Sequence, residues 1–376
     1  MITTSFRDTW AEVSLQAFAY NVNQFKQHIR KKTRLMAVVK ADGYGHGAVP
    51  MAEEALANGA EYLGVAFLDE AVTLREAGIT APILLLGYTA PHAVRTAIEQ
   101  DVTLTVYSEE SIEAICQAAE SLQKKAKVHL KIDTGMTRIG VRTAEEAVAL
   151  FQALDQEEIE VEGIYTHFAE ADNGESSAYT YQQFESFQHI YNAVEAKGYS
   201  IPIKHCCNSA GTISYPEMHL DMVRVGVSLY GLYPESHLKN ILSLKQVMSL
   251  KTKPVLIKNV PAGQSISYGR TYTTTKETKV ATLPIGYADG FSRLLSNQGH
   301  VTVRGKECLI VGRICMDQSM VDVSEVADIH DNDTITIFGE PSEGYISLET
   351  VAEQMQTIHY ETVCLIGKRV PRKYVK

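Results

Sequence analysis

Short apolar runs recur along the first 240 residues and are separated by segments in which apolar residues follow helical spacing. The runs occupy 35–40, 62–67, 82–87, 102–107, 127–133, 159–168, 203–208 and 222–230. In segment 181–197 the apolar face consists of Phe184, Phe187, Tyr191 and Val194. Continuous apolar strands that alternate with helices predict a parallel sheet whose two faces are both covered.

Eight such strand–helix units over roughly 200 residues match the size of a closed (β/α)8 barrel of the TIM type. A doubly wound open sheet is the alternative, but the first apolar run is not followed by a dinucleotide-binding glycine pattern. Before the repeat begins, residues 10–15 alternate weakly and predict a strand, and an amphipathic helix is expected from about 15 to 30.

The pattern changes near residue 240, where short alternating stretches bounded by turn residues replace the longer units. These stretches lie at 255–260, 279–290, 300–305, 308–317, 320–325 and 334–339, with a helix-like piece at 348–356. Period-two alternation is typical of antiparallel strands with one buried face. We therefore predict an α/β protein with a barrel over 12–240 and a mainly antiparallel β domain over 241–376.

Composition narrows the class of partner and the compartment. The 376 residues carry a formal net charge of −10, which disfavours nucleic acid or an anionic membrane as partner. The six cysteines show no CxxC pair and the twelve histidines no metal-ligand spacing, so we expect reduced thiols and no metal. No signal peptide or membrane-spanning run is visible, and a cytoplasmic location is expected.

A candidate for chemistry lies in the stretch LMAVVKADGYGHG at 35–47, where the apolar run ends at Lys40 and a glycine-rich turn follows. A lysine at the tip of a buried strand is poorly hydrated, so its charged form is disfavoured. Such an amine can form a Schiff base with an aldehyde such as pyridoxal phosphate (PLP). The alternative is a lysine that merely extends from the strand end into water.

Further polar residues follow the other predicted barrel strands, whose carboxyl ends face the active site in this fold. They are Tyr44, Lys131, Asp133, Arg138, His167, Asn208, Ser209, Arg224 and Gly226. A hydroxyl and backbone N–H groups at the last two strand ends, Ser209 and Gly226, suit phosphate binding. Taken singly, Arg224 could form a structural ion pair, His167 could be a satisfied core histidine, and Ser209 could cap a helix.

The β domain contributes candidates of its own. Tyr268 lies in QSISYGRTY, Tyr287 in LPIGYADG, Met316 in GRICMDQSM and Tyr360 in IHYETVC. The chain contains nineteen tyrosines, so any one of them could be a half-buried packing residue with a satisfied hydroxyl.

Taken together, these motifs resemble the alanine racemase family. AVVKADGYGHG, KIDTGMTRIG, YTHFAEAD, NSAG, RVGVSLYG, SYGRTY, LPIGYADG and GRICMDQ stand in the family's order across essentially the whole chain. The resemblance implies a PLP-binding barrel followed by a β domain that the N-terminal strand, residues 1–11, joins. It also implies a homodimer in which the β domain of one subunit completes the barrel mouth of the other.

The resemblance assigns the two catalytic bases. Lys40 resembles the lysine that holds PLP and then acts as one base, and Tyr268 of the partner subunit resembles the second base. Racemisation needs a group on each face of the reacting carbon, because one proton leaves as another arrives from the opposite side. The ordinary tyrosine pKa of roughly 10 is too high for this role unless nearby cations lower it.

Other positions resemble residues that surround the cofactor. Arg224 resembles an arginine that hydrogen-bonds the pyridine nitrogen and keeps it unprotonated, since arginine stays charged in proteins. His167 resembles the group that orients Arg224, and Arg138 an arginine beside the cofactor's phenolic oxygen and the substrate. Lys131 resembles a lysine that is often carbamylated. The phosphate set would be Tyr44, Ser209, Gly226 and Tyr360, and the substrate side would add Tyr287 and Met316.

The activity implied by the resemblance is the interconversion of L-alanine and D-alanine, with D-alanine supplied for peptidoglycan. A serine-preferring or broad-specificity racemase is the nearest alternative, because one sequence does not reveal pocket size. A basic-amino-acid decarboxylase would be expected to pair the pyridine nitrogen with a carboxylate, so Arg224 argues against it. A non-catalytic PLP-binding protein would lack the β domain.

Overall fold

The computed structural model describes residues 5–376; residues 1–4 of the predicted strand 1–11 lie outside the described residues. The chain forms two compact units. The first contains the described residues up to Ala17, the short segment Tyr44–His46 and Lys245–Lys376. The second contains Phe18–Gly43 and Gly47–Leu244.

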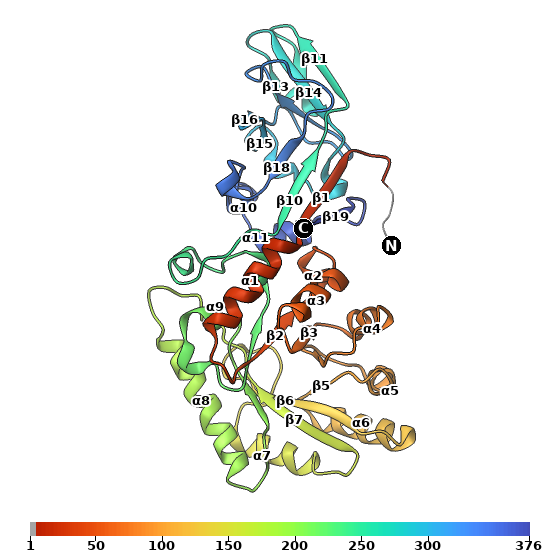
Figure 1. Ribbon diagram of the computed structural model, residues 1–376, viewed down its shortest axis with the longest axis vertical. Coiled ribbons are helices and arrows are strands. Elements are labelled where there is room, and N and C mark those ends of the chain that lie inside the picture. The colour runs from red at the N-terminus through yellow and green to blue at the C-terminus, as the bar shows by residue number, and fades with distance from the viewer. Residues whose placement is uncertain (1–4) are drawn as a thin grey trace. The chain divides into compact units, whose positions relative to one another are not determined.

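The second unit is a parallel barrel built from the apolar runs of the first 240 residues (Figure 1). Its strands are β2 Arg34–Val38, β3 Tyr62–Val65, β4 Ile83–Leu85, β5 Leu104–Val106, β6 Ala126–Lys131, β7 Ile159–Tyr165, β8 Ile203–His205 and β9 Met222–Val225. They pair in the orders β4-β3-β2-β9 and β5-β6-β7-β8.

Backbone hydrogen bonds join these two runs of strands at both edges. The Leu85 N–H donates to the Thr103 carbonyl at 3.0 Å, next to the first residue of β5. At the other edge the Arg224 N–H donates to the Cys207 carbonyl, also at 3.0 Å. The barrel is therefore closed, which confirms the predicted barrel and excludes the open doubly wound sheet.

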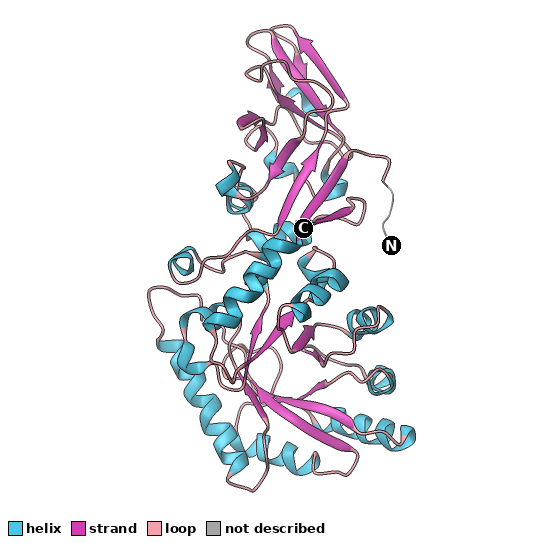
Figure 2. Ribbon diagram, in the orientation of Figure 1, coloured by secondary structure: helices cyan, strands magenta, loops and turns pink. Residues whose placement is uncertain are grey.

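Helices alternate with the barrel strands and lie outside them in this unit (Figure 2). They are α1 Leu15–His28, α2 Lys40–Tyr44, α3 Ala48–Ala57, α4 Leu68–Glu76, α5 Pro91–Glu99, α6 Glu109–Leu122, α7 Ala144–Ala153, α8 Ala178–Glu195 and α9 Ser209–Ser214. In α8 the predicted apolar face is confirmed, because Phe187, Tyr191 and Val194 are buried. A capping box between Thr143 and Glu146 fixes the start of α7.

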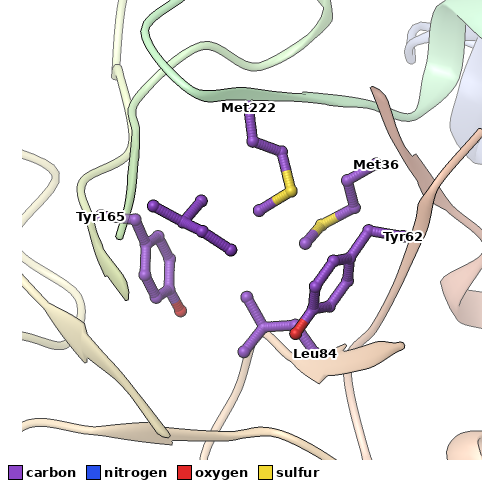
Figure 3. Packing of buried hydrophobic residues seen from close by; sticks show 6 residues of the cluster. Met36, Tyr62, Leu84, Tyr165 and Met222 are labelled. Atoms are coloured by element: carbon purple, nitrogen blue, oxygen red, sulfur yellow. The ribbon is translucent and has the colours of Figure 1, made fainter. Parts of the chain in front are cut away.

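Large side chains fill the interior of the barrel. Figure 3 shows a cluster drawn from strands β2, β3, β4, β7, β8 and β9, consisting of Met36, Tyr62, Leu84, Tyr165, Ile203 and Met222. Full burial of one such apolar side chain contributes about 1.5–3 kcal/mol. Because this core is packed, the residues at the carboxyl ends of the strands line an end of the barrel rather than a pore through it.

The first unit is mainly antiparallel, as predicted. Its larger sheet has the order β16-β15-β18-β10-β1-β19, in which only the β1–β19 pair is parallel among the described strands. These strands are β1 Thr9–Ser14, β10 Met248–Thr252, β15 His300–Val303, β16 Lys306–Leu309, β18 Ile335–Phe338 and β19 Arg372–Val375. β1 belongs to this sheet, in which it pairs with β10 and β19.

A smaller sheet and a hairpin complete the unit. They consist of β11 Leu256–Val260, β14 Thr278–Leu283 and β17 Ser319–Asp322, and of β12 Ser265–Ile266 with β13 Tyr272–Thr273. Two short helices follow, α10 Leu348–Gln354 and α11 His359–Cys364. Among residues 5–376, no helix is both long enough and apolar enough to span a bilayer.

Two alternating stretches of the β domain are shorter strands than their patterns indicate. The stretch 279–290 ends as a strand at Leu283, and 308–317 is strand only to Leu309. The remaining residues of both stretches form loops that meet backbone to backbone, where the Tyr287 N–H donates to the Cys315 carbonyl at 3.0 Å. A Cβ at Gly286 would collide with that carbonyl, so this close approach requires glycine.

Candidate active site

Lys40 stands two residues after β2, at the start of a turn with unusual backbone geometry. Ala41, Asp42 and Gly43 have φ values of 53°, 53° and 59°, in the left-handed region. For residues other than glycine this conformation costs about 1–2 kcal/mol each. The turn therefore needs specific support, and two carboxylates provide it, one from the turn itself and one from helix α4.

Two carboxylates hold the lysine turn. Asp42 Oδ1 accepts the Ala48 N–H at 2.8 Å, and Glu70 Oε1 accepts the Ala41 N–H at 2.6 Å. The other oxygen of Glu70 accepts the N–H groups of Ala66 at 2.7 Å and Phe67 at 3.2 Å. Glu70 thus ties the turn after β2 to the turn after β3. Sequence analysis missed it, although an acidic residue in the first turn of α4 was a visible signal.

Arg224 is a deeply buried cation, with 3% of its surface exposed. Its guanidinium donates to the carbonyls of Thr166 at 2.8 Å and Cys206 at 3.0 Å. It also donates to ring nitrogens of His167 at 3.2 Å and His205 at 3.0 Å. The structure therefore brings Arg224 and His167 into direct contact, as expected from the sequence.

The partners of Arg224 are carbonyls and imidazoles rather than carboxylates. Burial lowers the pKa of Arg224, since desolvation disfavours the charged form. Its guanidinium also lies 5.2 Å from the centre of the Tyr165 ring, a cation–π contact. A buried positive charge without a carboxylate partner is costly, so an anionic or electron-rich ligand at this point would be strongly favoured.

Lys131, the last residue of β6, is a second buried cation. Only 3% of it is exposed, and its Nζ donates to the Ile132 carbonyl. Burial, together with the charges of Arg224 and Arg138, lowers its pKa to about 7, and the opposing effect of Asp133 is smaller. A substantial fraction of this amine is therefore neutral near neutral pH.

The pKa of His167 reflects the positive charge at the barrel mouth. Burial lowers the pKa of His167 well below its ordinary value, and four surrounding cations lower it further. These cations are Arg224, Arg138, Lys131 and Lys40. Lysines and arginines in or after β2, β6 and β9 thus create an excess of positive charge at one end of the barrel.

The two predicted phosphate partners of the last strand ends bond to each other. Ser209 Oγ accepts the Gly226 N–H at 3.0 Å, and Ser209 is buried as the first residue of α9. The N-cap of that helix is Asn208, whose Oδ1 accepts the Gly211 N–H at 2.9 Å. The alternative role of Ser209 as the helix cap is therefore not the one observed.

These residues suit PLP chemically. The cofactor carries an anionic phosphate, a phenolic oxygen, a ring nitrogen that accepts hydrogen bonds and an aldehyde that reacts with an amine. The cations around His167 offset negative charge, Arg224 offers N–H donors, and Lys40 supplies the amine. In residues 5–376 no group of three or more histidine, cysteine or acidic side chains is arranged to hold a metal ion.

Tyr268 lies in the first unit, on a turn that exposes it. It opens the short 3-10 helix Tyr268–Arg270 and is 71% exposed. Residues on both sides have left-handed backbone angles, with φ of 65° at Ser267 and 70° at Gly269. Ser267 Oγ donates to the Arg313 carbonyl, which anchors the turn. The side chain of Tyr268 is therefore presented on a constrained backbone rather than packed into the domain.

Tyr287 and Met316 lie on the two loops that meet beyond β14 and β16. The Ala288 N–H donates to the Met316 carbonyl at 3.0 Å, and both predicted side chains are exposed. Sequence analysis missed the group that fixes these loops, the fully buried Asp289. Its carboxylate accepts two N–H groups of Arg7, each at 2.9 Å.

The last two phosphate candidates also belong to the first unit. Tyr44 follows the left-handed turn, with φ of 50°, and Tyr360 is in α11. Their assignment to the cofactor phosphate stays a prediction.

Comparisons with known proteins cover the whole chain. Residues 13–234 match the model of the alanine racemase N-terminal domain, and 247–374 that of the alanine racemase C-terminal domain. Alanine racemase 1 of Oceanobacillus iheyensis is 70% identical over 376 residues, which is all of both chains. Alanine racemase 2 of that organism is 60% identical over all of this chain and 95% of its own. The solved alanine racemase of Clostridium difficile 630 is 42% identical, with a TM-score of 0.94 over 100% of this chain and 97% of its own.

Proposed function

The chain belongs to the alanine racemase family and is an isomerase that racemises alanine, and from this premise we propose that it works with PLP by a two-base mechanism. The observation that carries the proposal is the environment of Arg224. Its guanidinium is buried, its partners among the described residues are two carbonyls and two imidazoles, and further cations surround His167 beside it. A serine-preferring or broad-specificity activity is not favoured by the relatives.

The residues of this chain divide the task of holding PLP among them. Lys40 would hold the aldehyde carbon, Arg224 the pyridine nitrogen and Arg138 the phenolic oxygen. The phosphate would be bound by Ser209, Gly226, Tyr44 and Tyr360. When bound, PLP withdraws electrons from the substrate's Cα and so makes its proton removable.

Arg224 sets how strongly electrons can be withdrawn. A guanidinium stays protonated in proteins, so Arg224 would donate to the pyridine nitrogen of bound PLP and would leave that nitrogen unprotonated. His167 supports this arrangement, because it accepts an Arg224 N–H through Nδ1 and its lowered pKa keeps the ring neutral. A weaker electron sink favours return of the proton to Cα, which is what a racemase requires.

Two groups move the protons, one on each face of Cα. We assign Lys40 Nζ to one face and Tyr268 Oη of the partner subunit to the other, so each direction has one acid and one base. Tyr287 and Met316 would border the substrate from that subunit. The exposed Tyr268 on its anchored turn supports this assignment, since a group that serves another subunit has to project from its own domain.

The Tyr268→Phe variant tests the two-base assignment. It should keep the absorbance of bound PLP and lose most racemisation, while α-hydrogen exchange with deuterated water persists for one enantiomer of alanine only. Tyr272→Phe, on the adjacent hairpin strand β13, is the matched control and should racemise normally. Normal racemisation by Tyr268→Phe would sink the assignment.

We also propose that the Lys131 amine carries a carbamate. Its neutral Nζ attacks carbon dioxide, so that a C–N bond forms as one C=O π bond breaks and its electron pair moves to oxygen. The nitrogen then loses a proton to solvent, which leaves an anion that can pair with Arg138. The pKa of about 7 supports this, because only the neutral amine reacts. With 13C-labelled carbon dioxide at fixed partial pressure, a carbamate NMR signal should grow as the pH rises through 7. The signal should be absent from Lys131→Met; a signal of equal size there would refute the site.

A further inference from the structure

We propose that Glu162 is a positioning residue for the racemase reaction, acting on Arg224 through a chain of two buried histidines, His205 and His129. The inference rests on the proposed role of Arg224 at the pyridine nitrogen. The proton positions along this chain of contacts can be measured whether or not that role is correct.

The chain crosses the barrel interior in three contacts. Arg224 Nη1 lies 3.0 Å from Nδ1 of His205. The other ring nitrogen of His205, Nε2, lies 2.8 Å from Nδ1 of His129. Nε2 of His129 then faces the Glu162 carboxylate at 3.8 Å. Both histidines are fully buried.

Proton positions in this chain follow from the chemistry of its ends. An arginine can only donate, so His205 Nδ1 must accept and the proton of that neutral ring is on Nε2. His205 Nε2–H therefore donates to His129 Nδ1, and the proton of His129 is on Nε2. Burial lowers the pKa of both histidines, which keeps them neutral. Every proton in the chain is thus directed from Arg224 towards Glu162.

The last contact is the loose one, and it involves a buried donor. At 3.8 Å the separation exceeds a hydrogen bond, and His129 Nε2 has no other hydrogen-bond partner among the described residues. A buried N–H without a full bond is expensive, so its orientation depends on the charge it faces. The Glu162 charge therefore stabilises the proton on Nε2 of His129, the position that the Arg224 end of the chain also requires.

Glu162 is placed there by a break in strand pairing. Val128 of β6 pairs with Val161 of β7, but the next residue, His129, pairs with Gly163. Glu162 is the extra residue of a β-bulge, a device that redirects a side chain. Gly163 makes room for the chain, because a Cβ there would lie 2.8 Å from the His129 ring and 2.5 Å from the Ile203 carbonyl.

The carboxylate is held in its ionised form. Tyr62 and Thr103 each donate a hydroxyl to Glu162 Oε2 at 2.9 Å. Burial opposes ionisation, but His129 and these two hydroxyls outweigh it and lower the pKa of Glu162 to about 2. A negative charge therefore persists at the end of the chain throughout the physiological pH range.

Aromatic packing holds the rings of His205 and His129 in place. The Tyr165 ring stacks on His205 with centroids 4.8 Å apart and an interplanar angle of 13°. His129 lies edge-on to Tyr62 and Tyr165, with centroids at 6.2 and 6.5 Å. These two tyrosines are the rings of the interior cluster in Figure 3. The core thus leaves the histidine rings little freedom to rotate, which preserves their contacts with Arg224 and with each other.

Because Glu162 acts through two histidines, Arg224 can be held in one orientation and still keep its positive charge available to a ligand. A carboxylate in direct contact would take up guanidinium donors and cancel much of its field. Acting through the two neutral histidine rings, Glu162 instead helps to fix which N–H groups of Arg224 bind within the protein. The positive charge of Arg224 stays next to Lys131 and His167. Burial is the main reason that the pKa values of both residues are lowered, and the charge of Arg224 lowers them further.

The decisive experiment compares the Glu162→Gln variant with the wild-type holoenzyme. Solid-state 15N NMR of labelled histidines reports which ring nitrogen carries the proton. The variants His129→Asn and His205→Asn assign the signals of the two rings. The wild type should show a proton on Nε2 and none on Nδ1 in both. Glutamine keeps the size but loses the charge, so the His129 signals should move. We expect kcat to fall about tenfold, which corresponds to about 1.4 kcal/mol, and KM to stay within about twofold.

Two matched variants separate charge from packing. Tyr62→Phe removes one donor to the same carboxylate and should keep both proton positions. Glu160→Gln changes an exposed carboxylate on the same strand and should alter neither spectrum nor kcat. A wild-type His129 with its proton on Nδ1 would overturn the proposal without any variant. So would a Glu162→Gln enzyme in which spectrum or kcat stays unchanged. Failure of the two-base scheme would instead appear in Tyr268→Phe and leave the wild-type histidine spectrum as described.

Discussion

At the scale of single residues, the site is built by groups that sequence reasoning could find and by groups that it could not. Lys40 and His167 were visible because a cation or imidazole stands at or next to the end of an apolar run, and Arg224 because it is a cation within one. Glu70 and Glu162 were not, since one lies in an ordinary-looking helix start and the other inside a strand. Their roles depend on contacts with residues distant in sequence, which no local pattern encodes.

The supporting role of Glu70 predicts a stability change. Glu70→Ala removes the acceptor of three backbone N–H groups, and we expect the free energy of unfolding to fall by about 1–3 kcal/mol. Urea denaturation measures this change. Glu76→Ala, an exposed carboxylate in the same helix, is the control and should change stability by less than about 0.5 kcal/mol. Equal effects of the two variants would contradict the role of Glu70 in the turn.

The ionised state of Glu162 predicts an acid dependence. Its pKa is lowered from 4.5 to about 2, so between these pH values the unfolded chain binds more protons than the folded one. Glu162 therefore stabilises the fold above pH 4.5, and this contribution is lost as the pH falls towards 2. Stability measured from pH 5 down to pH 3 should decline less steeply in Glu162→Gln than in wild type. Parallel curves would show that the carboxylate is not held in this way.

At the scale of elements, the period of the apolar residues predicted each barrel strand and the helix α8, because long buried runs and helical spacing are strong local signals. The strands β10, β12, β13 and β19 were missed. They are short or largely polar, and tertiary pairing rather than local preference forms them. The bulge at Glu162 was also beyond sequence reasoning, since it is a property of two strands in register.

The bulge predicts that Gly163 is not replaceable. In Gly163→Ala, the new Cβ would meet the Ile203 carbonyl at 2.5 Å and the His129 ring at 2.8 Å, so we expect a loss of about 1–3 kcal/mol from overpacking. Gly367→Ala is a suitable control, because its nearest neighbour would lie at 3.6 Å. Thermal unfolding distinguishes them. Tolerance of alanine at both positions would argue against a tightly packed ring beside Gly163.

At the scale of the whole molecule, the barrel and the mainly antiparallel domain followed from the change in pattern near residue 240. The compact units divide between Leu244 and Lys245, and β1 belongs to the first unit although it precedes the barrel in sequence. The pattern of apolar residues does not predict that β1 belongs to the β domain; this expectation came from the family resemblance. The same holds for the proposed homodimer, because residues that would serve a partner subunit look like ordinary exposed residues in one chain.

A mixing experiment tests the central claim, that Lys40 of one subunit and Tyr268 of the other form each active site. Lys40→Met and Tyr268→Phe should each be nearly inactive alone. After subunit exchange, half of the dimers are mixed and each mixed dimer contains one intact site, so racemisation should recover to about a quarter of the wild-type rate. If native mass spectrometry shows mixed dimers and activity stays absent, the two residues do not meet across subunits, and the shared-site account is wrong.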